Sequence, residues 1–172
     1  MSMNIRKMGL LFSFFAAILI FLSACVDGAA QKTASEGKTE TDKSADLGGN
    51  VVNIGFSGPL SGSAAYYGEK ITNGMKLAID EINQEGFEVN GKNYKLNLVS
   101  LDDKYLPNET AANAKRLVQQ NKTPFIFTPH SGGVAALQVF NEQDNFIIGA
   151  YTSEPAVTET GNQLTIRIPP RY

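Results

Sequence analysis

The stretch VVNIGFSGPLSGSAAYYGEKITNGMKLAIDEINQE, residues 51–85, places a strand pattern directly before a helix pattern. Val51–Phe56 is a short apolar run, which is typical of a strand buried in a sheet. Lys70–Glu85 then carries apolar side chains at helical spacing, and Gly86 follows as a predicted helix stop. The apolar positions of this predicted helix are Ile71, Met75, Ala78, Ile79 and Ile82. A strand followed by an amphipathic helix predicts the opening of a β-α-β unit.

The same alternation continues along the rest of the chain. Asn90-Gly91 predicts a tight turn before a second strand over residues 94–101. Asn108 or Thr110 is the expected N-cap of a second helix. Further predicted elements are strands over 124–128, 146–150 and 164–168, and a third helix marked by Val134, Leu137 and Phe140. This order predicts an α/β fold with an open, mainly parallel sheet and helices on both faces.

Residues 1–25 have the pattern of an export signal. The basic pair Arg6-Lys7 precedes an apolar run, Met8–Leu22, that is short for a membrane span. The run ends in Leu22-Ser23-Ala24-Cys25, which resembles the lipobox of bacterial lipoproteins, where the cysteine receives lipid. An ordinary signal peptide with a stray cysteine and an uncleaved anchor are the alternatives. Cys25 is the only cysteine, and we expect it to anchor an extracytoplasmic protein to the bacterial membrane.

Residues 26–50 differ in composition from the residues that follow them. They hold almost no large apolar side chains, so they cannot bury enough surface to offset the entropy of ordering. We therefore expect a flexible linker over 26–50 and a folded domain over 51–172. The formal net charge of −2 lacks the basic excess that nucleic-acid binding requires, so no nucleic-acid partner is expected.

Polar or glycine-rich segments follow four of the predicted strands. They are Ser57–Gly68, Asp102-Asp103, His130–Gly133 and Tyr151–Ser153. The carboxyl ends of parallel strands lie at one edge of a sheet, and open α/β sheets bind ligands beyond that edge. The sequence therefore predicts a binding site formed by these four segments.

Ser131 and Gly132 are the main candidates for ligand contact. They fall where a strand ends and a helix begins, and the first turn of a helix offers unpaired N–H groups and a partial positive charge. Glycine lets a ligand approach the backbone, and the Ser131 hydroxyl can donate to a carboxylate. The alternative is that Ser131 is only the N-cap of the helix.

The other candidates have ordinary structural alternatives. Tyr66 or Tyr67 could stack on a ligand side chain, or both could pack against the loop or face solvent. Asp102 and Asp103 could contact a ligand, but loop aspartates commonly cap backbone groups or face water. His130 is the only histidine, and no second histidine or nucleophile motif supports a metal or triad role. Common enzyme motifs are absent, so we expect no metal, no cofactor and no catalysis.

Several short motifs occur in a specific order along the folded part of the chain. They are Gly58-Pro59-Leu60-Ser61-Gly62, Tyr67-Gly68, Asn73-Gly74, Ala78–Asn83, Asp102-Asp103, Ser131 and Thr152-Ser153-Glu154-Pro155. In these motifs the chain resembles the type I periplasmic binding proteins, and among them the branched-chain amino acid binding proteins of ABC importers. The resemblance covers residues 51 to about 168.

The resemblance implies two α/β lobes that close on a small solute. It implies that the Ser131 hydroxyl binds the ligand's carboxylate, and that Tyr151 contributes backbone groups. Ser153 matches a threonine that contacts the carboxylate and the ammonium group, and Tyr67 matches an aromatic residue that lines the side-chain pocket. The implied partners are an amino acid or an analogue of one and the permease of an ABC transporter.

The length of the chain is short for this family. Family members have well over twice as many folded residues, so residues 51–172 correspond to the first segment of the N-terminal lobe, without the second lobe and the returning segment. We therefore expect half a cleft, weak or absent ligand binding by this chain alone, and exposed apolar surface with a free strand edge. A ligand-sensing domain of a receptor and a fragment of an exported α/β hydrolase are the alternative functions.

Overall fold

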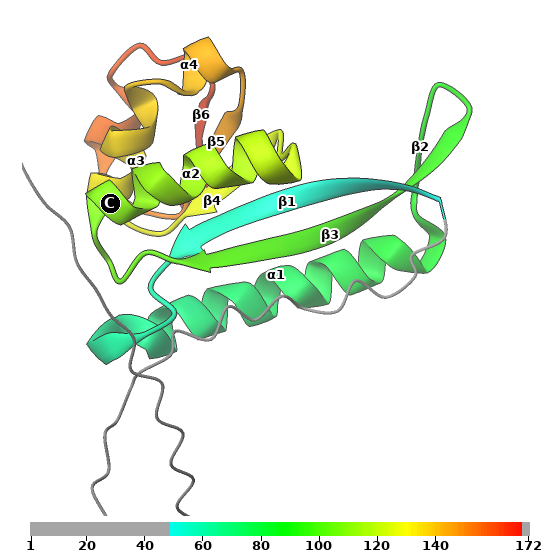
Figure 1. The fold of residues 1–172 in the computed structure, drawn as a ribbon, viewed down its shortest axis with the longest axis horizontal. Coiled ribbons are helices and arrows are strands. Elements are labelled where there is room, and N and C mark those ends of the chain that lie inside the picture. The colour runs from blue at the N-terminus through cyan, green and yellow to red at the C-terminus, as the bar shows by residue number, and fades with distance from the viewer. Residues whose placement is uncertain (1–48, 170–172) are drawn as a thin grey trace, which may run out of the picture. The chain divides into compact units, whose positions relative to one another are not determined.

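The computed structural model describes residues 49–169, so the predicted signal peptide, Cys25 and most of the predicted linker lie outside the described residues. The described part contains a six-stranded sheet in the order β2-β3-β1-β4-β5-β6 (Figure 1). The strands are β1 (Asn50–Gly58), β2 (Phe87–Val89), β3 (Lys92–Asp102), β4 (Phe125–Thr128), β5 (Ile147–Ala150) and β6 (Thr165–Arg167). All neighbouring pairs are parallel except β2 and β3, which confirms the predicted mainly parallel sheet.

Helices cover both faces of this sheet, as predicted. The helical segments are η1 (Gly62–Ala64), α1 (Ala65–Glu85), α2 (Pro107–Asn121), α3 (Ser131–Gln138), α4 (Asn141–Asp144) and η2 (Pro155–Thr158). Figure 1 shows α1 along one side of β1 and β3, and α2 on the opposite side. None of the helices within residues 49–169 combines the length and apolar content that a bilayer crossing needs.

The segment after α1 contains a strand that the sequence pattern did not predict. Gly86 ends the helix as expected: its backbone has φ 78°, and a Cβ there would lie 2.7 Å from the Tyr94 carbonyl oxygen. The chain then turns at Asn90-Gly91, both with positive φ, so that β2 pairs antiparallel with β3. β2 is only three residues long, which is too short for a period-2 pattern to identify it.

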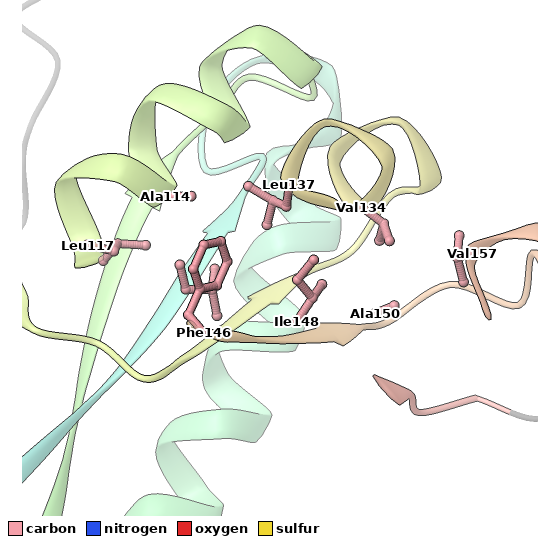
Figure 2. Packing of buried hydrophobic residues seen from close by; sticks show 9 residues of the cluster. Ala114, Leu117, Val134, Leu137, Phe146, Ile148, Ala150 and Val157 are labelled. Carbon is pink, nitrogen blue, oxygen red and sulfur yellow. The ribbon is translucent and has the colours of Figure 1, made fainter. Parts of the chain in front are cut away.

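The main hydrophobic core lies between the sheet and the helices α2 and α3 (Figure 2). Its members share near-complete burial: Ala114, Leu117, Ile126, Val134, Leu137, Phe146, Ile148, Ala150 and Val157. Complete burial of a Leu- or Ile-sized side chain contributes roughly 1.5–3 kcal/mol. This core therefore fixes α3, with Ser131 at its first position, against β4 and β5.

Three helix boundaries differ from the sequence-based prediction. α1 begins at Ala65 and not at Lys70, so Tyr66 and Tyr67 lie in its first turn and not in the preceding loop. Neither Asn108 nor Thr110 caps α2, because the helix begins at Pro107 with Leu106 at the N-cap position. Proline suits the first helical position, because an N–H group at that position would have no partner within the helix. The Thr110 hydroxyl donates to Asp103. α3 ends at Gln138, so Phe140 is not part of it; Phe140 instead precedes the short helix α4.

One face of the sheet carries apolar side chains that the described residues cover only in part. β6 lies at an edge of the sheet, and Ile166 on this strand is 52% exposed. Gly149 lies close to the rings of Phe125 and Phe127, which places these aromatic side chains on the face of β4 and β5 opposite Ile126 and the core. Within residues 49–169, the expected exposed apolar surface and strand edge are therefore present.

Candidate functional site

The four candidate segments leave the sheet at one edge, as predicted. In the β1–β3 pair, Gly58 lies opposite Asp102, and in the β4–β5 pair, Thr128 lies opposite Ala150. Backbone hydrogen bonds join the segments further, from Asp103 N–H to the Gly58 carbonyl (3.0 Å) and from Tyr151 N–H to the Thr128 carbonyl (3.0 Å). We call this edge, where the loops after β1, β3, β4 and β5 meet, the rim.

Asp102 holds the loop after β1 in place. Its carboxylate accepts hydrogen bonds from the Leu60 N–H (2.8 Å), from the Ser61 hydroxyl and from the Lys104 N–H (2.9 Å). Partial burial alone would raise the pKa of Asp102, but these hydrogen bonds outweigh it and lower the pKa below its ordinary value of 3.8. The carboxylate is thus used by the fold, and this contact positions the segment that leads into α1.

Asp102→Asn is expected to reduce the dependence of stability on acid pH. Because the native pKa is lowered, the carboxylate's stabilisation is complete above about pH 4 and is lost as the pH falls through the native pKa. The difference in urea-unfolding free energy between wild type and variant should therefore shrink between about pH 6 and about pH 2. Ser61→Ala, which keeps the charge and removes one donor, should show the same trend more weakly. A difference that stays constant over this pH range would contradict the assignment.

Asp103 is fully buried and serves the fold rather than facing the rim. Its side chain is 0% exposed and accepts from the Ser57 hydroxyl (3.3 Å), the Thr110 hydroxyl (2.8 Å) and the Tyr105 N–H (2.9 Å). His130 Nε2 lies 3.1 Å from the same carboxylate. Asp103 therefore joins β1, the start of α2 and the loop after β4, which favours the structural alternative over ligand contact.

His130, and not Ser131, is the N-cap of α3. The buried His130 ring accepts from the Gly133 N–H at Nδ1 (2.9 Å), so its remaining nitrogen, Nε2, carries the proton toward Asp103. The alternative reading of Ser131 as a mere cap is therefore wrong. Ser131 is the first residue of α3, and its side chain is exposed at the rim.

The two glycines after Ser131 have packing reasons of their own. A Cβ at Gly132 would lie 2.9 Å from Pro107 Cγ, and one at Gly133 would lie 2.7 Å from Thr128 Oγ1. Gly133 is buried within the first turn of α3, while Gly132 is partly exposed beside Ser131. The close packing of α3 on its neighbours therefore requires small residues here, whether or not a ligand approaches.

Three tyrosines gather at the rim. Partial burial raises the pKa of Tyr67, and the nearby phenols of Tyr105 and Tyr151 raise it further. Tyr66 is more exposed, at 67%, and the Lys70 ammonium lies 4.4 Å from its ring centroid. Sequence reasoning missed Tyr105; its only signal was an aromatic residue in a polar loop directly after a strand.

Hydrogen bonds also join the segment after β5 to neighbouring strands. The Tyr151 N–H is already used by Thr128, so its carbonyl and phenol are the groups that a ligand could meet. The half-buried Ser153 accepts at its carbonyl from Arg167 Nη1 (3.3 Å). Within residues 49–169, no group of three or more His, Cys, Asp or Glu side chains is arranged to hold a metal ion.

Comparison with known proteins places this arrangement in a family. Residues 51–166 match the family model described as periplasmic binding protein. An amino acid binding protein of Pseudomonas aeruginosa is 35% identical over 110 residues, covering 63% of this chain and 29% of its own length. A Leu/Ile/Val-binding protein of Rhizobium johnstonii is 30% identical over 112 residues, covering 64% of this chain and 29% of its own length.

The fold matches solved structures as well. The substrate-binding protein of a branched-chain amino acid transporter from Streptococcus pneumoniae, solved in complex with isoleucine, is 28% identical with a TM-score of 0.62. The match covers 71% of this chain and 34% of that one, so the chain spans about a third of the length of such relatives. The family match and the shared lobe architecture agree, and the chain belongs to the periplasmic binding protein family.

Proposed function

We propose that this chain is part of an extracytoplasmic solute-binding protein of an ABC importer, which captures an amino acid or a similar small carboxylate without catalysis. The observation that carries the proposal is the exposed start of α3 at the rim, where Ser131 lies next to segments from three other strands. The names of the relatives, which describe amino acid and Leu/Ile/Val binding, support the same class of solute.

The first turn of α3 suits a carboxylate. His130 takes up the N–H groups of Gly133 and Val134, through its ring and its carbonyl, which leaves those of Ser131 and Gly132 for a ligand. The helix dipole favours an anion there by about 0.3–1 kcal/mol, and the Ser131 hydroxyl adds a donor. The carboxylates of Asp102 and Asp103 at the rim are already hydrogen-bonded to other groups.

The remaining parts of the proposal concern the rest of the protein. We infer that Tyr67, Tyr151 and Ser153 complete the ligand contacts, that lipid on Cys25 anchors the protein, and that a permease receives the solute. The lipobox-like sequence before Cys25 supports the anchor. Fractionation of cells that produce the Cys25→Ser variant would test the anchor. The variant is expected to lose its association with the membrane.

Ser131→Asp is expected to reduce solute binding by more than about tenfold, because a fixed carboxylate takes the ligand's place and repels its charge. Binding is measured from leucine-induced shifts of backbone amides by NMR, which detects millimolar affinities. Asp in a first helical turn is favourable, so the unfolding free energy should stay equal or rise by about 0.3–1 kcal/mol.

Ser131→Ala is the matched control, because it removes only one hydroxyl. It should weaken binding by about 2- to 10-fold, the range for a single hydrogen bond. Unchanged leucine binding by Ser131→Asp, with the variant folded, would place the solute elsewhere and contradict the proposal.

A further inference from the structure

Three half-exposed tyrosines lie on segments of the rim, at the same edge of the sheet as the proposed carboxylate site. Tyr67 lies in the first turn of α1 (40% exposed), Tyr105 in the loop between β3 and α2 (48%), and Tyr151 directly after β5 (40%). These segments follow β1, β3 and β5, whose carboxyl ends share the rim. Core packing does not require aromatic side chains that are this exposed. Their position at a predicted ligand site therefore indicates contact with a ligand.

The backbone holds Tyr105 in an unusual conformation. Lys104 and Tyr105 have φ values of 53° and 65°, in the left-handed region that side chains other than glycine rarely adopt. Asp102 and Asp103 accept the N–H groups of these two residues, each at 2.9 Å. The side chains of two aspartates, themselves tied to the fold, therefore maintain the position of Tyr105.

The Tyr105 ring is also fixed by stacking. It lies on the buried His130 ring, with centroids 4.5 Å apart and an interplanar angle of 27°. His130 immediately precedes Ser131, so the aromatic ring stands beside the start of α3. One face of the ring is covered, and nearly half of the side chain remains open to solvent.

The two aspartates that lead into the Tyr105 loop are both engaged in hydrogen bonds of the fold. The Asp103 side chain is fully buried, and the Asp102 carboxylate accepts three hydrogen bonds from the rim loops. The raised pKa of Tyr67 is consistent with a partly buried phenol that has two other phenols nearby. A neutral aromatic wall beside an anion site suits a ligand with a charged end and a flat apolar end.

We propose that Tyr67, Tyr105 and Tyr151 form the side-chain subsite, and that the solute is a small carboxylate carrying an aromatic ring. This inference rests on the proposed solute-binding function and on carboxylate binding at Ser131. Favourable ring–ring geometry is worth about 2- to 10-fold in affinity for each aromatic pair, beyond simple burial. An aromatic ring therefore gains from this wall what a saturated ring of equal size does not.

The test is ¹⁹F NMR of the chain labelled with 3-fluorotyrosine, titrated separately with benzoate, cyclohexanecarboxylate and leucine. Benzoate and cyclohexanecarboxylate share charge and approximate size and differ in aromaticity. Tyr→Phe variants assign the signals. Tyr66, over Lys70, and Tyr94, which stacks on Phe87 at the far end of β3, are internal controls.

The expected result is that benzoate shifts the signals of Tyr67, Tyr105 and Tyr151 and leaves those of Tyr66 and Tyr94 unchanged. Benzoate should bind at least about fivefold more tightly than cyclohexanecarboxylate. Tyr105→Leu should remove most of this preference, while Tyr66→Leu should keep it. Circular dichroism confirms that each variant is folded.

Equal affinity for benzoate and cyclohexanecarboxylate would overturn the aromatic assignment. A second result would also overturn it: leucine shifts the backbone amide signals of Ser131 and Gly132, but benzoate shifts none of the three tyrosine signals. The proposed function would then stand without the inference. If none of the three acids perturbs either the amides or the tyrosines at millimolar concentrations, the inference is overturned, whereas the proposed function, for which weak or absent binding by this chain alone is expected, is not contradicted.

Discussion

Asp103→Ala is expected to lower the free energy of unfolding by about 3–5 kcal/mol, the range for removing one partner of a buried charged network. The residue is 0% exposed, and its carboxylate accepts from Ser57, Thr110 and the Tyr105 N–H, with His130 Nε2 at 3.1 Å. Alanine would leave the Ser57 hydroxyl and the Tyr105 N–H without this acceptor, while the Thr110 hydroxyl keeps the Leu106 carbonyl at 3.1 Å. Urea unfolding followed by far-UV circular dichroism measures the change.

Asp103→Asn separates the loss of hydrogen bonds from the loss of volume. The amide keeps the size of the side chain and one acceptor oxygen, but its NH₂ group faces donors, so the loss should be intermediate. If the Asp103→Ala protein does not fold at all, the unfolding free energies of Asp103→Asn and wild type can still be compared. An Asp103→Ala protein within about 1 kcal/mol of wild type would show that the network does not stabilise the fold.

Gly68→Ala is expected to destabilise the chain, toward the upper end of the roughly 1–3 kcal/mol that overpacking costs. A Cβ at this position would lie 1.8 Å from the Pro59 carbonyl oxygen and 2.8 Å from its carbonyl carbon. Both obstructing atoms are backbone, so the first turn of α1 would have to move away from the loop after β1. Tyr67 lies in that turn, and we expect weaker solute binding as well.

Gly74→Ala in the same helix is the matched control. A Cβ at Gly74 would have nothing within 4 Å, so only helix propensity acts there. Alanine is the better helix former by about 0.5–1 kcal/mol, and this variant should be more stable than wild type by that amount. The same substitution would thus change the free energy of unfolding in opposite directions at two positions six residues apart, as measured by urea unfolding. Equal effects of both substitutions would mean that Gly68 makes no close contact.

The strongly periodic elements were predictable because their signals are local. The apolar run before Gly58 and the helical spacing up to Gly86 each depend on side chains within a few residues of one another. The placement of all four candidate segments at the rim followed from parallel pairing alone, and the register confirms it. β2 was missed because its strand character comes from pairing with β3 and not from its own three residues.

The details of the site depended on contacts between distant segments. Thr110 is a residue type that favours the N-cap position, yet its hydroxyl donates a hydrogen bond to the Asp103 carboxylate in the loop before α2. His130 became the cap of α3 because its ring is buried between Asp103 and Tyr105, an arrangement that no local pattern encodes. For the same reason the exposed position of Ser131 at the first turn could be known only after His130 was placed.

By itself, the sequence determined the α/β class, the order of the main strands and helices, and the edge at which a ligand would bind. These follow from hydrophobic period and chain direction, which are properties of neighbouring residues. Only the tertiary structure decided which polar side chains support the fold and which remain open to a solute. That division depends on burial and on hydrogen-bond partners that are distant in sequence. Asp103 and His130, for example, are 27 positions apart.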